Sequence, residues 1–212
     1  MYEKWKPIYT ALACDVMDQM GYRHQAMEHH IRPSQPDSWL AGPATTLDVW
    51  ADPTPSDDPY GMVFEAYNQV EKGNVIVIAT NGEHQSGMWG ELLSTAAQAQ
   101  GVNAVVTDGL VRDIRLMDQM NFSCFCRGYT PLDSAGRSLA KAVNTPVQCG
   151  GITVQPGDFV LADFEGVAVI PADIVEAVYQ KSMEKLEGEN TVRQELADGH
   201  SPREVFDKYG IL

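Results

Sequence analysis

Two short apolar runs and the segment between them constrain the fold more than any other part of the chain. VIVIA (75–79) and VNAVVT (102–107) are rich in β-branched residues and lack a regular polar alternation, which is typical of strands covered on both faces. GELLSTAAQAQ (90–100) has the apolar spacing of an amphipathic helix, and Gly101 is its stop signal. The stretch therefore predicts a strand, a helix and a second, parallel strand of one sheet.

Helices and strands are also predicted on both sides of this central unit. The other predicted helices span 10–20, 61–72, 114–120, 172–188 and 201–210. The other predicted strands are 44–50, 122–126, the arms of a hairpin at 147–154, and two strands of VQPGDFVLADFEGVAVIP on either side of a turn at 164–166. We expect Pro171 in the first turn of its helix, and a capping box of Ser201 and Glu204 at the start of the last one.

This order of elements predicts one mixed α/β domain over residues 1–212. Its centre alternates strand and helix, its later part is rich in strands with a hairpin, and its end is helical. No internal repeat and no long linker divides the chain. We expect a parallel core, an antiparallel portion and C-terminal helices.

Charge and composition exclude several classes of function. The formal net charge is −14, which repels phosphate backbones, so we expect no direct binding of nucleic acid. No run approaches the ~18 apolar residues of a membrane span, and the first residues lack the pattern of a secretory leader. The four cysteines form no CxxC pair, which favours reduced core thiols over a zinc site. These features predict a cytoplasmic protein.

The loop before the 90–100 helix is a candidate binding site for an anion. GEHQSGMWGELL (82–93) places three glycines ahead of the helix, so the backbone can approach a ligand closely at Gly90. The amides of Glu91, Leu92 and Leu93 have no acceptor within the helix and lie at the positive end of its dipole. A carboxylate can bind there without a lysine or an arginine.

A second candidate follows the next strand, in VVTDGLVRDIR (105–115). Arg112 and Asp113 are adjacent opposite charges, and two interpretations are open. In one, Asp113 caps a helix and Arg112 is solvated. In the other, Arg112 binds a carboxylate through its planar fork, and Asp113 is an oxygen ligand for a metal. Loops that follow successive parallel strands emerge at the same sheet edge, so we expect both charges to face the start of the 90–100 helix.

The run GELLSTAAQAQGVNAVVTDGLVRDIR resembles the RraA-like family, which includes metal-dependent 4-hydroxy-4-methyl-2-oxoglutarate/4-carboxy-4-hydroxy-2-oxoadipate aldolases and regulators of ribonuclease E. CDVMDQMG, VQPGDFVLADFEGVAVIP and the tail EVFDKYGIL also resemble it, so the likeness spans nearly the whole chain. Its centre is an acid, twenty intervening residues and Arg-Asp, here Glu91, Arg112 and Asp113. The aldolases have Asp at the first of these positions, so Glu91 is a departure.

The resemblance implies a swivelling β/β/α fold, a class II pyruvate aldolase that cleaves 4-hydroxy-2-oxo diacids, and oxaloacetate decarboxylation as a side activity. By it, Asp113 binds Mg²⁺ or Mn²⁺, Arg112 holds the substrate oxyanion, and the amides of Leu92 and Leu93 receive the pyruvyl carboxylate. Glu91 orients a water or relays the proton. The implied partners are a small 2-oxo acid and further copies of the chain, as a homotrimer or a dimer of trimers.

Two other functions remain open at this point. One is a metal-dependent lactone or sugar-acid hydrolase on the same fold, in which the metal activates water. The other is a non-enzymatic regulator of an RNA-processing enzyme, although that branch typically lacks the full acid and Arg-Asp set. Two further residues have two interpretations each. His84, in the glycine-rich loop, either contacts the substrate or is an ordinary polar loop residue. Trp89 either lines the crevice or packs into the core.

Overall fold

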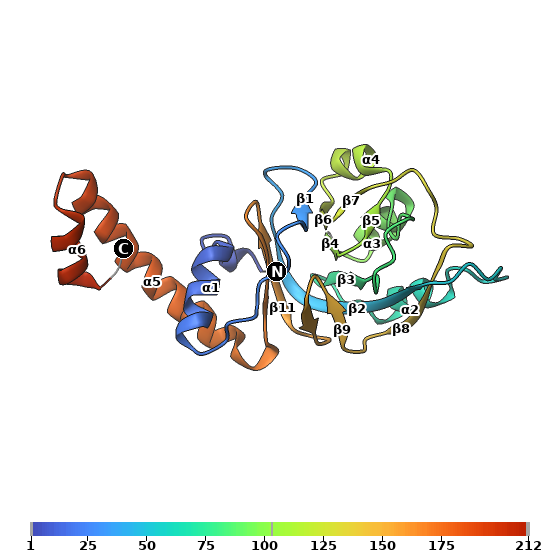
Figure 1. The fold of residues 1–212 in the computed structure, drawn as a ribbon, viewed down its shortest axis with the longest axis horizontal. Helices are drawn as coiled ribbons and strands as arrows, with labels where there is room; N and C mark the ends of the chain where they lie inside the picture. The colour runs from blue at the N-terminus through green and yellow to red at the C-terminus, as the bar shows by residue number, and fades with distance from the viewer. Residues whose placement is uncertain (1, 103, 211–212) are drawn as a thin grey trace.

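The computed structural model describes residues 2–102 and 104–210, and a twisted mixed sheet forms its centre (Figure 1). Seven strands follow the order β1-β6-β4-β3-β2-β11-β12, and β8 also pairs with β2. The strands of this sheet are β1 (Arg32–Pro33), β2 (Leu40–Ala51), β3 (Val75–Ala79), β4 (Ala104–Thr107), β6 (Ser123–Cys126), β8 (Ser138–Val143), β11 (Phe159–Asp163) and β12 (Gly166–Ile170). The predicted mixed α/β fold with C-terminal helices is confirmed.

The central strand–helix–strand unit forms as the sequence predicts. β3 and β4 pair in parallel, with Ile76 opposite Val105 and Ile78 opposite Thr107, and α3 (Glu91–Ala99) connects them. Both strands are buried along their described length, in agreement with their apolar character. Asn103, which belongs to the second predicted strand, and Ile211 and Leu212, which end the tail segment, lie outside the described residues.

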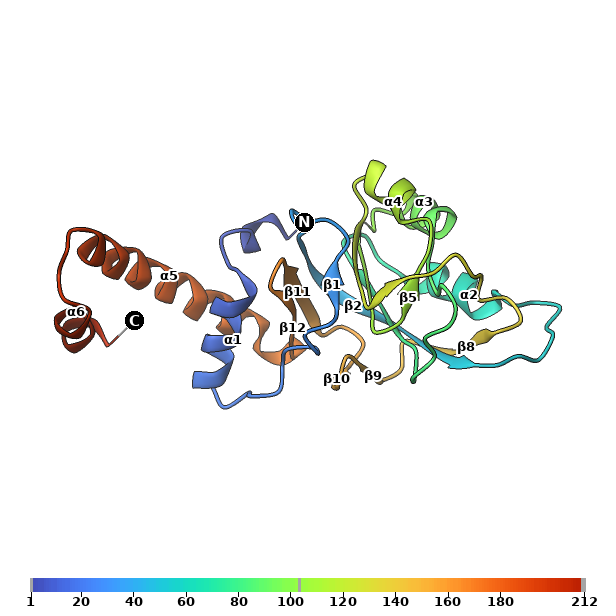
Figure 2. The same ribbon diagram turned by 45° about the horizontal axis from the view of Figure 1, so that its top comes forward.

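Helices cover one face of the parallel strands and a hairpin covers the other. α2 (Gly61–Gln69), α3 and α4 (Ile114–Gln119) bury their apolar sides in one core cluster with Ile76, Val105 and Cys124. β9 (Val147–Cys149) and β10 (Ile152–Val154) belong to the cluster on the opposite face, together with Val77 and Phe125. Figure 2 shows α3 and α4 side by side above the sheet.

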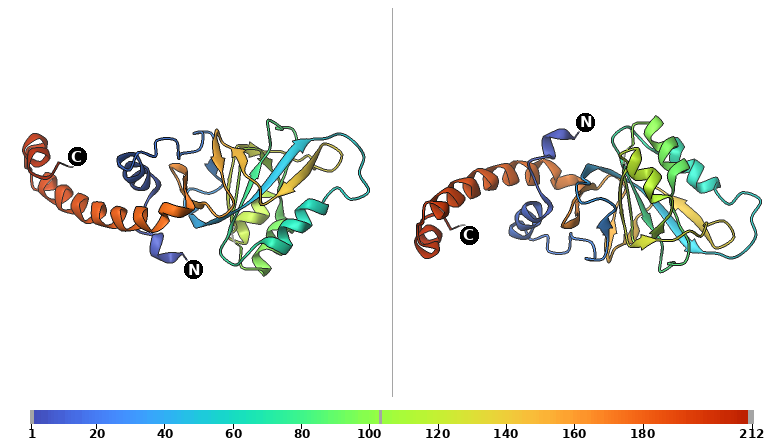
Figure 3. Two further views of the ribbon diagram at one scale, coloured as in Figure 1. Left: turned by 90° about the horizontal axis from the view of Figure 1, so that it is seen from below. Right: turned by 90° about the horizontal axis from the view of Figure 1, so that it is seen from above.

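A third apolar cluster lies where the sheet turns antiparallel. α1 (Thr10–Gln19) packs against β11, β12 and α5 (Val175–Ala197). The short 3₁₀ turn η1 (Glu3–Trp5) precedes α1, and η2 (Ala172–Ile174) precedes α5. The far part of α5 and α6 (Pro202–Tyr209) extend away from the sheet as an arm, opposite the loop between β2 and α2 (Figure 3). Within the described residues, no helix is both long and apolar enough to cross a membrane.

Strand β2 is longer than the predicted 44–50 because it pairs with three strands: β11 near its start, and β3 and β8 further along. Residues Leu40–Pro43 pair with β11, and Ala44–Asp48 pair with β3 in the opposite direction. Pro43 has no N–H to donate, and it lies where one set of partners gives way to the other. A proline inside a strand is tolerated at such a junction. The strand predicted from the sequence began only after this proline, at residue 44.

The ends of several helices also differ from the predictions. α2 ends at Gln69, since Val70 is extended. Pro171 is not in a first turn: it precedes η2 with an extended ψ of 136°, and α5 begins only at Val175. Ser201 is the N-cap of α6, but its side chain makes no capping bond, so the expected capping box is absent.

The hairpin, the second turn and the cysteines agree with the sequence. Gly150 and Gly151 have φ of +58° and +81° between antiparallel β9 and β10, as the predicted two-residue turn requires. Two residues, 164 and 165, separate β11 from β12. All four cysteines are free, and burial raises the pKa of the Cys149 thiol.

We predict that Gly42→Ala destabilises the fold by about 1–3 kcal/mol, because overpacking against a rigid neighbour forces the backbone to move. A Cβ at Gly42 would lie 2.2 Å from the Gly73 carbonyl oxygen, which is main chain and cannot rotate away. Urea denaturation measures the change. Gly128→Ala is the control, since its Cβ would have no neighbour nearer than 3.4 Å; equal stability of the two variants would contradict the prediction.

Candidate functional site

The structure brings the two candidate loops together through their main chains. Met88 N donates to the Leu110 carbonyl at 2.9 Å, and Arg112 N donates to the Trp89 carbonyl at 2.9 Å. These bonds attach the glycine-rich loop to β5 (Leu110–Val111), which pairs with β7 (Gly128–Tyr129). Gly90, at the start of α3, therefore lies beside Arg112 and Asp113, as the strand order predicted.

Arg112 and Asp113 point to the same side of the chain. The Arg112 Nε and the Asp113 Oδ2 are 3.3 Å apart, and the two side chains are 34% and 38% exposed. Asp113 is the N-cap residue of α4, yet its carboxylate makes no capping bond. Its side chain thus does not cap the helix, so the prediction of a capping role for this carboxylate is wrong.

The backbone of Asp113 is left-handed, with φ of +57° and ψ of +26°. Few residues other than glycine adopt this conformation, and aspartate and asparagine do so most readily. A left-handed non-glycine residue costs about 1 kcal/mol or more unless its surroundings hold it. Here the conformation turns the carboxylate toward Arg112 and the beginning of α3.

Gly90 leaves the space that these two side chains occupy. A Cβ on Gly90 would lie 2.7 Å from Asp113 Oδ2 and 3.1 Å from Arg112 Cγ. The backbone of Gly90 is extended, with φ of −160°, so its need for glycine is one of space. No side chain caps the first turn of α3, so the amides of Leu92 and Leu93 have no side-chain acceptor there.

Glu91 lies in the first turn of α3, but its carboxylate is turned along its own helix. The Thr95 hydroxyl, one turn further on, donates to Glu91 Oε1 at 2.8 Å. Among the described residues, no hydrogen bond or ion pair joins Glu91 to Arg112 or Asp113. To reach their crevice, the Glu91 side chain has to leave Thr95.

Two residues near Arg112 were missed by the sequence analysis. Asp133 Oδ1 is 3.6 Å from Arg112 Nη1, and the Tyr60 hydroxyl donates to Asp133 Oδ2 at 3.0 Å. Tyr60 precedes α2, and Asp133 lies in the loop between β7 and β8. Neither is next to a predicted strand end, so no local signal marked them.

These neighbours stabilise the negative charge of Asp133. Burial by itself raises the pKa of this carboxyl, but the Tyr60 hydrogen bond and the positive charge of Arg112 outweigh it, so the pKa lies below its usual range. Burial and the same hydrogen bond raise the pKa of Tyr60. At neutral pH, Asp133 is therefore a carboxylate and Tyr60 keeps its proton.

The structure also shows where other polar and aromatic residues near the two loops lie. Trp89 is buried, donates from Nε1 to Ser94 Oγ at 2.8 Å, and stacks on Tyr67 and Phe122, so it belongs to the core. His84 is exposed in the loop. Asp108, in the turn after β4, accepts hydrogen bonds from Thr80 N and from Gly150 N and so connects two loops.

The residues present fit a divalent metal that uses a single protein carboxylate. No group of three or more His, Cys, Asp or Glu ligands occurs within residues 2–102 and 104–210. Mg²⁺ typically takes one or two carboxylates and keeps waters or substrate oxygens as its other ligands. The Asp113 carboxylate is partly exposed and free of helix capping, so it can offer an oxygen to such an ion.

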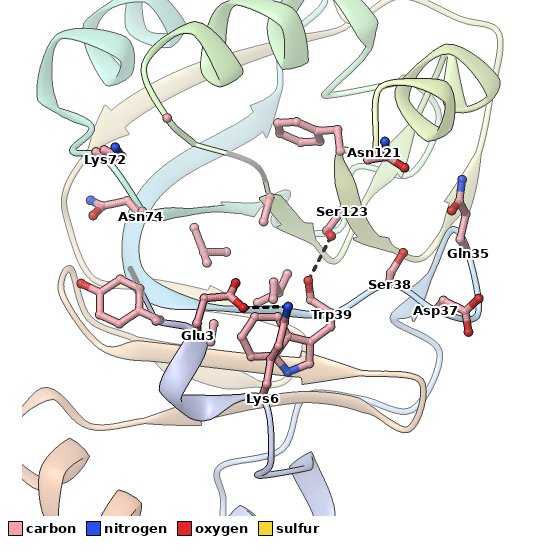
Figure 4. Close-up of a pocket in the computed structure, with 18 residues that line it drawn as sticks. Glu3, Lys6, Gln35, Asp37, Ser38, Trp39, Lys72, Asn74, Asn121 and Ser123 are labelled. Atoms are coloured by element: carbon pink, nitrogen blue, oxygen red, sulfur yellow. Dashed lines mark hydrogen bonds and ion pairs between the residues drawn. The ribbon is translucent and has the colours of Figure 1, made fainter.

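A cavity of about 630 Å³ lies at the opposite edge of the sheet, near the starts of β3, β4 and β6 (Figure 4). Two pairs of its polar groups bind each other: Lys6 pairs with Glu3 at 2.7 Å, and the Ser123 hydroxyl donates to the Trp39 carbonyl at 3.1 Å. Asn74 donates to Thr45. The cavity lies at the starts of the strands, whereas Arg112 follows the ends of β3 and β4, and we do not assign it as the site.

Comparison with known proteins agrees with this architecture. The RraA-like family (Aldolase/RraA) matches residues 10–169, and the chain belongs to this family. A protein of Halalkalibacterium halodurans named "Putative 4-hydroxy-4-methyl-2-oxoglutarate aldolase" is 33% identical over 195 residues, which cover 92% of this chain and 88% of that protein.

Solved structures share the fold. An uncharacterized protein from Pseudomonas syringae pv. tomato superposes with a TM-score of 0.86 at 26% identity, covering 98% of this chain and 92% of the other. A Streptomyces coelicolor protein described as an unusual member of the RNase ES inhibitor RraA family gives 0.81 at 24% identity, covering 90% of this chain and 95% of the other. The family resemblance and the fold class inferred from the sequence are confirmed.

We predict that Gly90→Ala lowers catalytic turnover more than it lowers stability. The added methyl group has to displace the Asp113 carboxylate and the Arg112 stem, while the extended backbone accepts alanine without strain. Misplacement of a reacting group by about 1 Å can cost about a hundredfold in rate. Steady-state assays with 2-oxo acids and thermal denaturation measure the two effects; wild-type kcat/KM in the variant would contradict the role of this space.

Proposed function

We propose that the chain is a divalent-metal-dependent, class II pyruvate aldolase that cleaves 4-hydroxy-2-oxo diacids, with oxaloacetate decarboxylation as a side activity. The observation that carries this proposal is the adjacent Arg112 and Asp113 beside the open first turn of α3. The name of the Halalkalibacterium relative supports the same class of reaction.

Asp113 would hold the Mg²⁺ or Mn²⁺. When bound, such an ion polarises the carboxylate and keto oxygens of a 2-oxo acid as a Lewis acid. The carboxylate of the substrate would rest on the amides of Leu92 and Leu93, at the positive end of α3. Gly90 lets the Asp113 carboxylate and the Arg112 side chain lie against the start of α3, beside these amides.

Arg112 would stabilise the charge that develops during the reaction. Loss of the proton from the C4 hydroxyl breaks the C3–C4 bond, releases a carbonyl product and leaves the electron pair in pyruvate enolate. The guanidinium beside the enolate oxygen offers a fixed donor, and preorganised donors of this kind contribute about 3–4 kcal/mol. Protonation at C3 completes pyruvate. Loss of CO₂ from oxaloacetate gives the same enolate, which explains the expected side activity.

Glu91 would relay the proton, after its carboxylate leaves the Thr95 hydroxyl. A carboxylate acts as a general base when it comes within hydrogen-bond reach of the proton, directly or through one water. The additional methylene of glutamate, relative to the aspartate of the aldolase pattern, allows this longer reach.

We also propose that the chain assembles as a homotrimer or a dimer of trimers, with the sites near the interfaces. Large apolar side chains are exposed around Arg112 and Asp113: Leu92 (76%), Leu116 (50%), Tyr129 (55%) and Leu132 (43%). Leu92 follows Gly90 in α3, Leu116 follows Asp113 in α4, and the carbonyl of Leu132 accepts from Gly87. An apolar rim of this kind is typical of a protein interface.

We predict that sedimentation equilibrium gives three or six times the chain mass of 23.3 kDa. The apolar rim loses its contact with water when copies associate, which favours assembly. Leu116→Asp would weaken the assembly, since it places a charge in that rim. A monomer at micromolar concentration in the wild type would contradict the proposal.

Arg112→Ala and Asp113→Asn are each expected to remove nearly all release of pyruvate while changing the thermal midpoint little, since asparagine tolerates the left-handed backbone at position 113. Partly exposed ion pairs contribute about 0–1 kcal/mol to stability, so the fold does not depend on this pair. The assay is a panel of 4-hydroxy-2-oxo acids and oxaloacetate with Mg²⁺ or Mn²⁺.

The same panel separates the other functions. A lactone or sugar-acid hydrolase would release no pyruvate above background and would turn over lactones instead. A regulator of an RNA-processing enzyme would be inactive on every compound, and its binding to that enzyme would survive Arg112→Ala. Either result would reject the aldolase.

A further inference from the structure

The guanidinium of Arg112 lies between two carboxylates and uses a different nitrogen toward each. Its Nε is 3.3 Å from Asp113 Oδ2, and its Nη1 is 3.6 Å from Asp133 Oδ1. Within the described part of the chain, no hydrogen bond or ion pair involves its Nη2. The two carboxylates thus attract the guanidinium from two of its nitrogens and leave the third, Nη2, for a ligand.

The two carboxylates are not equivalent. Asp113 is the residue that would hold the metal, and a carboxylate oxygen engaged by a dication is a weaker partner for a guanidinium. Asp133 is not assigned to the metal. When Asp113 is engaged, Asp133 is the remaining anionic partner of Arg112 that the structure provides.

Asp133 is itself held in place from two sides. The Tyr60 hydroxyl donates to its Oδ2 at 3.0 Å, and the Ser134 amide donates to its Oδ1 at 2.7 Å. Its loop is attached to the glycine-rich loop, because Gly87 N donates to the Leu132 carbonyl at 2.9 Å. A Cβ on Gly87 would be 3.2 Å from Arg112 Cβ, so the same region also confines the stem of Arg112.

We propose that Asp133, braced by Tyr60, is the positioning residue that keeps the Arg112 guanidinium directed at the substrate while Asp113 is occupied. This inference rests on the proposed function for its catalytic consequence, but the ordering of Arg112 can be tested without any activity. The distance of 3.6 Å is that of an ion pair and not of a hydrogen bond. Its effect is therefore one of orientation, with little contribution to stability.

Two variants separate orientation from folding. Asp133→Asn removes the charge but keeps an oxygen for the Ser134 amide, and its amide group can donate to Tyr60. Tyr60→Phe removes the brace and keeps the ring. The matched controls are Asp15→Asn, which breaks an ion pair with Lys185, and Tyr9→Phe, which breaks a hydroxyl–carboxylate bond to Glu189. Both controls lie on or next to α1, away from the site.

The first measurement is the ¹⁵N relaxation of the Arg112 Nε–H group, assigned by its disappearance in Arg112→Lys. We expect high order in the wild type and in both controls, and a clear loss of order in Asp133→Asn and Tyr60→Phe, larger when saturating Mg²⁺ is present. Unchanged order in Asp133→Asn with Mg²⁺ would overturn the proposal.

The second measurement is the kinetics of pyruvate release. We expect kcat/KM to fall about ten- to a hundredfold in Asp133→Asn, with a smaller fall in Tyr60→Phe, because a misdirected donor loses its effect on the transition state. Asp133→Glu, which restores the charge, should recover part of the loss. A loss of Arg112 order with unchanged kcat/KM would overturn the catalytic consequence.

The two proposals fail in different ways. If the wild type releases no pyruvate but Arg112 loses order in Asp133→Asn, the aldolase function is wrong and the positioning by Asp133 stands. If the wild type is active and Arg112 keeps its order in both variants, the function stands and the positioning is wrong.

Discussion

The site depends on main-chain hydrogen bonds between two loops that leave neighbouring parallel strands. Met88 and Trp89 of one loop bond to Leu110 and Arg112 of the other, and these bonds do not require any particular side chain. They place the first turn of α3 against Arg112 and Asp113, and the absence of a side chain at Gly90 leaves room for these two side chains. The charges are thus held by a backbone frame, and their own ion pair adds little to its stability.

This arrangement separates the requirements of folding from those of chemistry. The apolar clusters on the two faces of the sheet contain none of the charged residues of the candidate site. Arg112, Asp113 and Asp133 are all partly exposed at the edge where β3 and β4 end. Substitutions of these charges should therefore test the proposed function, while substitutions such as Gly42→Ala report on the stability of the sheet.

Elements with a clear periodicity or distinctive turn residues could be predicted from the sequence. β3, α3 and the hairpin at Gly150 and Gly151 have strong local signals, and strand order alone brought Gly90 to Arg112. Asp133 and Tyr60 could not be predicted, because they reach Arg112 through tertiary packing and lie beside no predicted strand end. The full length of β2 was also missed, since Pro43 marks a change of partner that only the assembled sheet reveals.

The left-handed backbone of Asp113 limits which residues can replace it. Aspartate, asparagine and glycine tolerate this conformation, whereas β-branched residues do not. Of these three, only aspartate carries a charge. A change to asparagine would keep the loop and exchange one oxygen for a nitrogen, so the frame could persist after its chemistry is lost. Members of a fold family that have abandoned catalysis can arise by so small a step, without passing through an unstable chain.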